Sequence, residues 1–283
     1  MKFSSLIRKL GRKSASNEGG GPVSAPILGP VVRFPYGAFQ LKARITKGVA
    51  FQIEATTDLE HWQTIANETD AAETIEYVDS DASKFSHRYY RIKVGGVYSA
   101  NVMGYAAVTL APGFSMIANP FDAPNNSVSE LLKDLPDGTR INRFDTRFFK
   151  LTENFFKGGS WTNPSEKLVP GEGAILLNPT PDYKVLSFVG TVMQGNLSIP
   201  IAGGFSVRSS LVPQAGRLHA DLGFPIAEGD VIHLYDRDRQ KYVLYPYDPV
   251  AWNTNPPVVS VGESFWVAKT SPGNWTRNIS LSG

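Results

Sequence analysis

Glu172 and Glu263 are the residues whose type and spacing most invite a chemical role. Each follows a glycine, and the two Gly-Glu pairs lie 91 residues apart. Two carboxylates that face one another across a pseudo-twofold axis would suit general acid and base catalysis. A glutamate between a glycine and a strand can equally bind loop amides and fix a turn. Because no nucleophile, metal-ligand set or phosphate loop accompanies the pair, we favour the turn role and expect no enzyme.

The remaining metal-binding residue types are scattered along the chain. No two of the four histidines (His61, His87, His219 and His233) have a spacing typical of a metal site, and there is no cysteine. Asp79-Ser80-Asp81 lacks the glycine and final glutamate of an EF-hand loop, so an Asx turn explains it better. We therefore expect neither a metal nor a cofactor.

An internal duplication is the strongest organisational signal. Gly113-Phe114-Ser115-Met116 recurs as Gly204-Phe205-Ser206-Val207, and the same offset pairs Trp161 with Trp252. A fixed offset without a gap marks two copies of one supersecondary unit. We place the repeats at 113–191 and 204–282 within a domain spanning 103–283. Trp161, Trp252, Glu172 and Glu263 are the predicted anchors of the repeat cores.

Each copy is expected to run strand, helix or helical turn, hairpin, long loop, strand, strand. Ser127 and Glu130 form a capping-box pattern before a short helix in the first copy. The hairpin connections are predicted at 145–148 and 236–240. Among the many aromatic residues, we interpret Phe156, Tyr247 and Trp275 as unmatched between the copies and predict that they form an interaction surface.

The segment 31–102 contains closely spaced β-type runs, with clear alternation in Phe51-Gln52-Ile53-Glu54. Its residues 55–62 (ATTDLEHW) and 89–92 (YYRI) resemble the fibronectin type III-like β-sandwich modules of bacterial surface and secreted proteins. Asp58 is expected to cap a tight turn, and Trp62 to return into the core. The resemblance implies a spacer or binding platform. The duplicated part is also similar to C-terminal modules of bacterial surface proteins that carry GFS, F-D and G-E-G/A signatures.

Residues 1–30 form a basic arm and a linker rich in Gly, Ser and Pro. The apolar residues of the arm follow a helical period and basic residues surround them, so a helix here would be amphipathic and would order on a membrane surface or partner. A disordered tail and the remnant of an export signal remain alternatives. The predicted anchoring residues are Phe3, Leu6, Ile7, Leu10, Arg8, Lys9 and Arg12.

The sequence thus predicts an all-β protein: a fibronectin type III-like sandwich followed by two tandem β units. The net charge of +2 gives no reason to expect nucleic acid. The leading interpretation is a non-catalytic structural or assembly protein of a virion, envelope or filament, with protein partners or self-assembly. The alternative is a cell-surface carbohydrate-binding or adhesion module. No signal peptide or transmembrane helix is evident, so we expect cytoplasmic synthesis with incorporation into a particle or envelope.

Overall fold

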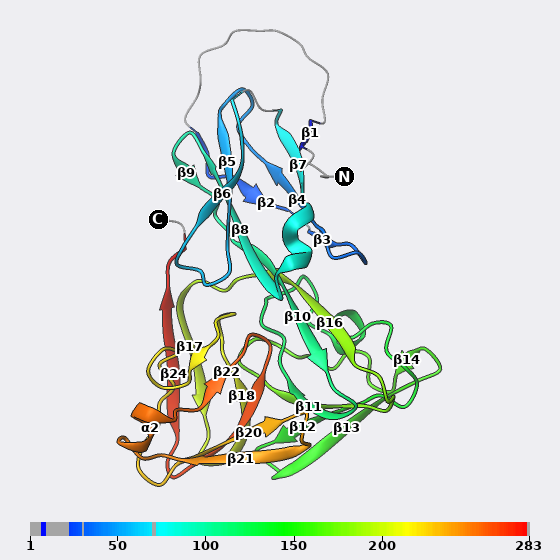
Figure 1. Ribbon diagram of the computed structural model, residues 1–283, viewed down its shortest axis with the longest axis vertical. Helices are drawn as coiled ribbons and strands as arrows, with labels where there is room; N and C mark the ends of the chain where they lie inside the picture. The colour runs from blue at the N-terminus through cyan, green and yellow to red at the C-terminus, as the bar shows by residue number, and fades with distance from the viewer. Residues whose placement is uncertain (1–6, 10–22, 30, 70–71, 282–283) are drawn as a thin grey trace. The chain divides into compact units, whose positions relative to one another are not determined.

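The computed structural model describes residues 7–9, 23–29, 31–69 and 72–281 (Figure 1). In these residues almost all regular structure is β, which confirms the predicted all-β class. The helical pieces are a 3-10 helix η1 (Ser80–Lys84) and two single turns, α1 (Val128–Leu131) and α2 (Ala251–Thr254). The chain divides into two compact units. Unit 1 comprises Met1–Tyr105, Val189–Val192 and Ser280–Gly283, and unit 2 comprises Ala106–Phe188 and Met193–Ile279.

Unit 1 is built from two sheets. One has the order β1-β7-β4-β2 with β3 added to β4, and the other has the order β16-β10-β8-β5-β6 with β9 added to β8. The strands are β1 (Ile7–Lys9), β2 (Ile27–Leu28), β3 (Val32–Arg33), β4 (Phe39–Arg44), β5 (Phe51–Thr56), β6 (Gln63–Glu68), β7 (Thr74–Asp79), β8 (His87–Val94), β9 (Val97–Tyr98), β10 (Met103–Leu110) and β16 (Lys184–Thr191). Strands β10 and β16 each have residues in both units.

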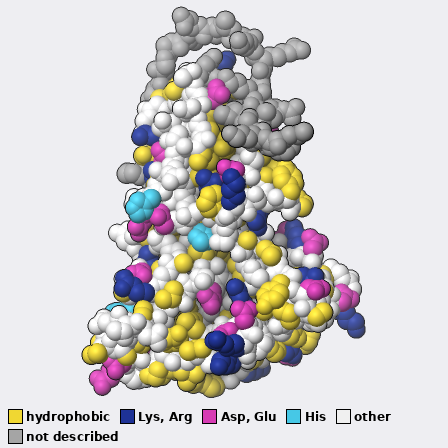
Figure 2. Space-filling view, viewed as in Figure 1, with side chains coloured by type: hydrophobic (Ala, Val, Ile, Leu, Met, Phe, Trp, Pro, Cys, Tyr) yellow, Lys and Arg dark blue, Asp and Glu magenta, His cyan; other side chains and the backbone are white. Residues whose placement is uncertain are grey.

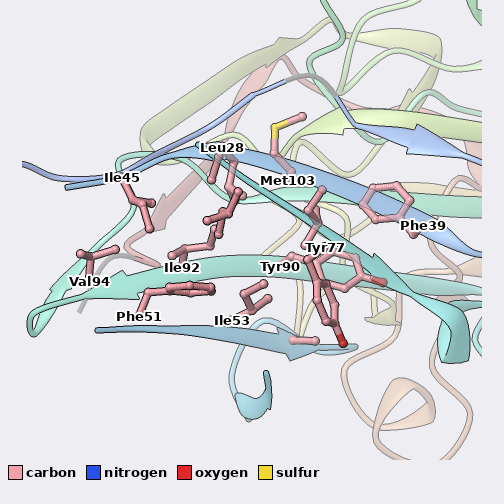
Figure 3. Close-up of a cluster of buried hydrophobic side chains, with 14 of the residues drawn as sticks. Leu28, Phe39, Ile45, Phe51, Ile53, Tyr77, Tyr90, Ile92, Val94 and Met103 are labelled. Atoms are coloured by element: carbon pink, nitrogen blue, oxygen red, sulfur yellow. The ribbon is translucent and has the colours of Figure 1, made fainter. Parts of the chain in front are cut away.

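The core of unit 1 follows from the alternation of its strands. In β4 the side chains of Phe39, Leu41 and Ala43 are buried while their neighbours are more exposed, as a period of two requires. They meet Ile53 and Tyr90 of the other sheet in one apolar cluster, which Figure 3 shows between the strands. Burial of alternate residues on two facing sheets is what holds a β-sandwich together.

The arm is a strand where it is described, which corrects the predicted amphipathic helix. Ile7–Lys9 forms β1 and pairs antiparallel with β7, so that Ile7 lies opposite Tyr77 and Lys9 opposite Ile75. The physical reason is that β7 is otherwise an edge strand with free backbone groups, and a short helix is marginal by itself. The other predicted arm residues, Phe3, Leu6, Leu10 and Arg12, lie outside the described residues.

Unit 2 contains two sheets of the same design, one from each repeat. The first has the order β11-β15-β12-β13-β14 and the second has the order β18-β23-β20-β21. Their strands are β11 (Gly113–Ile117), β12 (Arg140–Asp145), β13 (Lys150–Lys157), β14 (Ser160–Trp161), β15 (Ala174–Asn178), β18 (Gly204–Ser209), β20 (Val231–Asp236), β21 (Lys241–Pro246) and β23 (Ser264–Lys269). The small pairs β17 (Gly195–Ile201) with β24 (Gly273–Ile279), and β19 (Gly216–Arg217) with β22 (Val258–Val259), complete the unit.

The two sheets also share their register and their hairpin turns. Gly113 lies opposite Asn178 in the first sheet, and Gly204, 91 residues later, lies opposite Lys269 in the second. The hairpin residues Phe149 and Gln240 are equivalent, and both have φ of 51°. A one-residue slip would turn every side chain of a strand to the other face, so matching registers give the repeats matching faces.

The repeats exchange equivalent backbone hydrogen bonds. The N–H of Ala118 donates to the carbonyl of Gly262 at 2.8 Å, and the N–H of Ser209 donates to the carbonyl of Gly171 at 3.2 Å. Ala118 and Ser209 are equivalent positions, 91 residues apart, and so are Gly171 and Gly262. The repeats are therefore related by a pseudo-twofold axis. Gly262 must be glycine here, since its φ is +79° and a Cβ would overlap Val108.

The helical turns differ from the sequence predictions. Ser127 is the N-cap of α1, but its side chain makes no capping bond and its hydroxyl lies 3.1 Å from that of Ser129. Glu130 instead forms an ion pair with Lys133 at 2.6 Å, so the predicted capping box is wrong. The second repeat has its own turn, α2, where a long loop was expected. The Asp248 carboxylate accepts hydrogen bonds from the N–H groups of Val250 and Ala251 at 2.8 and 3.0 Å, and the buried Trp252 packs this turn on the core.

Candidate functional site

The candidate site is a groove in unit 2 that we call the aromatic groove. It is lined by Phe144, Phe149, Phe205, His233, Tyr242 and Trp266, and its volume is about 330 Å³. Both repeats contribute to it through the hairpins β12–β13 and β20–β21 and through strands β18 and β23. Figure 2 shows hydrophobic side chains gathered over these hairpins, at the bottom of the view.

The aromatic groove arises because both faces of each sheet carry apolar residues. In β20 and β23, Ile232, Phe265 and Val267 point into the core of the second repeat. Their neighbours His233 and Trp266 therefore point to the opposite face, as strand geometry requires. Where the corresponding faces of the two repeats meet, Met116, Ile175 and Val207 form a small buried cluster. The aromatic groove opens at the edge of that cluster.

The rings of the groove contact one another edge to face. Phe144 lies 5.2 Å from Phe149 and 4.9 Å from Trp266, with interplanar angles of 78° and 67°. Phe205 lies 6.1 Å from Phe149 at 71°. This is the preferred geometry of aromatic pairs, and it fixes ring positions before any ligand arrives.

Large apolar side chains remain exposed around the groove. Phe149 is 63% exposed, Phe148 on the same hairpin is 68% exposed, and Leu244 on the second hairpin is 56% exposed. Leu151 and Phe155 on β13 are exposed as well. Several large exposed apolar residues on one part of a surface are typical of an interaction site.

The groove is electrically neutral near pH 7. Burial lowers the pKa of His233 and so favours its uncharged imidazole. Burial also raises the pKa of Tyr242, whose hydroxyl accepts a hydrogen bond from the Trp266 indole at 3.1 Å. The six lining residues contain no carboxylate and no aliphatic hydroxyl. Their chemistry therefore suits binding by apolar and ring contacts.

Glu172 and Glu263 each serve the loop that carries them. Glu263 accepts a hydrogen bond from the N–H of Ser260 at 2.9 Å, and Glu172 accepts one from Val169, the equivalent residue, at 3.4 Å. Glu172 also pairs with Arg143 at 2.7 Å. Burial raises the pKa of Glu263. The same loop bond in both repeats is the geometry that a turn-fixing role requires.

The residues predicted as an interaction surface are placed differently. Phe156 and Trp275 are 8% and 0% exposed, so the prediction is wrong for these two residues. Tyr247 is half-buried. Phe156 and Tyr247 are in fact equivalent, because they lie 91 residues apart. Each packs edge to face on the tryptophan of its repeat, Phe156 on Trp161 at 5.3 Å and Tyr247 on Trp252 at 5.1 Å. This shared ring pair explains the burial.

The predicted anchors Trp161 and Trp252 are both buried, at 4% and 8% exposure. Their indole N–H groups donate to different carbonyls, those of Leu132 at 3.1 Å and Pro246 at 2.9 Å. Trp161 lies in a strand and Trp252 in a helical turn. The repeats therefore keep the ring but differ in the backbone around it.

The motif residues of unit 1 form a structural cluster. The Arg91 guanidinium lies 4.1 Å from the ring centres of both Trp62 and Tyr98 and pairs with Glu54 at 2.7 Å. Trp62 is half-buried on this cation, which corrects its predicted return to the core. Asp58 accepts bonds from the N–H groups of Glu60 and His61, each at 2.8 Å, so its carboxylate does cap the turn.

Asp79 and Asp81 form the expected Asx turn, since the N–H of Asp81 donates to Asp79 at 3.0 Å. Asp79 also pairs with Arg88 at 2.8 Å. Within the part of the chain that the structure describes, no three His, Cys, Asp or Glu side chains are grouped so as to hold a metal ion. No helix among these residues is long and apolar enough to cross a membrane.

Comparison with known proteins gives similarity to solved structures alone. No protein-family model and no curated protein matches this chain. A solved structure described as a tetra-tandem repeat in the extending region of a large adhesion protein aligns with 91% of this chain at 11% identity and a TM-score of 0.22. The aligned region spans 66% of that protein's chain.

Proposed function

We propose that this chain is a non-catalytic interaction protein whose unit 2 binds a protein partner through the aromatic groove and the exposed hairpin residues around it. The supporting observation is the set of mostly exposed rings, Phe148 and Phe149 above all, on a rigid β scaffold. Aromatic residues in a well-packed scaffold contribute most of the energy of protein interfaces.

The proposal keeps the structural or assembly role inferred from the sequence. Unit 1 would act as a fibronectin type III-like spacer. Apart from the additional strands β1, β3, β9 and β16, its sheet orders are β7-β4-β2 and β10-β8-β5-β6, and this division into three and four strands supports the reading. Self-assembly, with a second copy as the partner, is included in the proposal.

Carbohydrate binding is the second candidate, because sugars also stack on aromatic rings. Sugar hydroxyls, however, need hydrogen-bonding partners, and a site without them leaves those hydroxyls unpaired. In the aromatic groove only His233, Tyr242 and Trp266 have polar side-chain atoms, and Tyr242 and Trp266 bind one another. This composition favours an apolar protein segment over a glycan.

Photo-crosslinking tests the proposed surface. A photoreactive amino acid placed at Phe149 or Leu244 should crosslink the chain to a discrete protein, or to a second copy, in extracts of the cells that make it. The same amino acid at Ser198, an exposed polar position in β17, is the matched control and should give at least tenfold less product. Replacing Trp266 with alanine should reduce the crosslinks, since it removes one wall of the groove. Equal labelling from all three positions would contradict the proposal, as would crosslinks confined to glycans.

We further propose that the arm contributes to attachment. Deleting residues 1–20 removes β1, which contributes only three residue pairs at the edge of β7. The truncated chain should therefore keep its two-unit fold, measured by circular dichroism, and should lose attachment to its particle or membrane in a sedimentation assay. A charge-only variant with Arg8 and Lys9 replaced by glutamine should weaken attachment in a salt-dependent manner. Normal attachment of the truncated chain would show that the arm is a passive tail.

A further inference from the structure

Strand β18 has an unpaired edge beside the aromatic groove. Strands β11 and β18 are the edge strands of the two repeat sheets. An edge strand presents unpaired N–H and C=O groups that can accept another strand. The repeats are equivalent in register, so their edges can be compared atom by atom.

On the first repeat this edge is closed by a side chain of the second. The N–H of Phe114 donates to Gln240 Oε1 at 2.7 Å, and Gln240 Nε2 donates to the carbonyl of Phe114 at 2.8 Å. The Tyr235 hydroxyl donates to the same Gln240 oxygen at 3.1 Å. The carboxamide of Gln240 thus satisfies both outward backbone groups of Phe114, as the peptide unit of a neighbouring strand would.

On the second repeat the equivalent positions cannot make this closure. Phe205 corresponds to Phe114, Phe149 to Gln240, and Phe144 to Tyr235. Because the registers match, the N–H and C=O of Phe205 also point away from the neighbouring strand. Among the described residues, no side chain and no loop backbone makes a hydrogen bond to these two atoms of Phe205. A phenyl ring stands where the other repeat has an amide.

The glycines that precede Phe114 and Phe205 also differ in how much space surrounds them. A Cβ on Gly113 would overlap the carboxamide of Gln240, whereas a Cβ on Gly204 would meet nothing within 4 Å. The edge of β18 is therefore open at the point where the edge of β11 is covered. Phe149, 63% exposed, leaves room for a ligand beside it.

The side chains around the open edge define the chemistry of its occupant. An extended peptide added to β18 would direct alternate side chains to the face that carries Phe205, and so into the aromatic groove. Arg147 and Lys150 flank Phe148 and Phe149 on the hairpin. The one acidic residue there, Asp145, lies 3.6 Å from the Arg147 guanidinium, whereas Lys150 forms no ion pair with a described residue, so the tip keeps one positive charge in excess. The hairpin tip therefore favours a partner that carries a carboxylate.

We propose that the edge of β18 at Phe205 binds an extended peptide segment of a partner protein by strand addition, with an apolar side chain in the aromatic groove and an acidic residue near Arg147 and Lys150. The proposal rests on the protein-binding function proposed above and specifies its partner. Gln240 is the internal counterpart of this ligand, since it makes the same pair of bonds on the other repeat.

Amide hydrogen exchange in the free protein tests the open edge. Phe205 should exchange about tenfold faster than Phe114, the difference expected for one hydrogen bond of typical strength. In the variant F149Q, Phe205 should slow to the rate of Phe114, because glutamine already adopts the same φ at position 240. In Q240F, Phe114 should become fast. Equal protection of Phe114 and Phe205 in the parent would overturn the proposal.

Peptide selection tests the ligand. A display library of random dodecapeptides, screened on the full chain, should yield peptides with an apolar residue next to an acidic one. Their affinity should fall about tenfold or more for F149Q, whose amide occupies the edge, and for peptides N-methylated at the paired residue. F149L also removes the ring but carries no amide, so the comparison of the two variants isolates the closing of the edge: F149Q should bind about fivefold or more weakly than F149L.

The outcomes separate the two proposals. If F149L and F149Q weaken binding equally, or if N-methylation has no effect, strand addition is wrong while the aromatic groove remains a binding surface. If no peptide binds the parent better than F149Q, the inference is also overturned. In both cases the crosslinks from Phe149 and Leu244 decide independently whether the groove binds a protein.

Discussion

Replacing Asp230 with alanine is expected to destabilise unit 2 by about 3–5 kcal/mol, the usual cost of breaking a buried ion pair. The side chains of Asp230 and Lys269 are 0% and 5% exposed and form a direct ion pair. Asp230 also accepts bonds from the N–H of Thr270 at 2.7 Å and of Ala227 at 2.8 Å. Alanine would leave the Lys269 ammonium and two amides without this partner. Urea unfolding followed by circular dichroism measures the loss.

The first repeat supplies the control for this prediction. Its equivalent positions hold Thr139 and Asn178, both buried and neutral. Asn178 donates to the carbonyl of Asp182 at 2.8 Å. The double variant D230T/K269N therefore installs a pair that the same sheet geometry already accommodates, and it should cost clearly less than D230A. A double variant as unstable as D230A would show that the loss does not come from an unpaired charge.

The pair also predicts a pH dependence. Burial alone would raise the pKa of Asp230, but the bonds from Lys269, Thr270 and Ala227 outweigh it and hold the pKa below its usual value. A carboxylate with a lowered pKa in the folded state contributes stability above its unfolded pKa of about 3.9, and the contribution is lost as pH falls through the folded value. The parent should lose stability more steeply than D230T/K269N below about pH 4.

Replacing any of Trp161, Trp252 and Trp275 with alanine is expected to cost about 3–5 kcal/mol, the range for deleting a large buried aromatic side chain. All three are buried, and each indole N–H donates to a backbone carbonyl; for Trp275 this is Leu222 at 2.8 Å. In W161A the Leu132 carbonyl also loses the indole donor, whereas in W275A the Leu222 carbonyl keeps its hydrogen bond from Arg277 at 3.0 Å. Denaturation followed by far-ultraviolet circular dichroism avoids the loss of tryptophan fluorescence.

Phenylalanine variants at the same positions should lose less than the alanine variants, because the ring contacts are partly kept. For W161F and W252F the edge-to-face partners Phe156 and Tyr247 remain in place. W275A is the sharpest test, since Trp275 packs on Phe224 at 4.9 Å and has no equivalent in the first repeat. If W275A unfolds at the same denaturant concentration as the parent, the burial of Trp275 is contradicted.

The duplication and its register were readable in the sequence because a gapless offset preserves the alternation of every strand. The hairpins at 145–148 and 236–240 were likewise predicted close to their observed positions, since Asp145 and Asp236 each accept bonds from loop N–H groups. The aromatic groove was missed. Its signal lay in the residues between the core positions: Trp266 lies between Phe265 and Val267, and His233 lies between Ile232 and Leu234, so both faces of these strands carry large apolar or aromatic side chains.

Local patterns misled where a distant partner decided the outcome. The period of residues 3–10 predicted a helix, but Ile7–Lys9 forms a strand, because the edge of β7 offers backbone hydrogen bonds that the isolated arm lacks. The capping-box pattern at Ser127 and Glu130 yielded to other partners for both side chains. Trp62 was expected in the core and lies on Arg91, a residue that no spacing rule connects with it.

The sequence by itself determined the all-β class, the two tandem repeats and their common register, because strand alternation and a constant offset are properties of the chain alone. Only the tertiary structure decided which equivalent positions differ in environment. Phe149 and Gln240 occupy the same turn with the same φ, yet one leaves the edge of β18 open and the other closes the edge of β11. The reason is that each meets a strand of the other repeat, and such a meeting depends on how the two repeats pack around their pseudo-twofold axis.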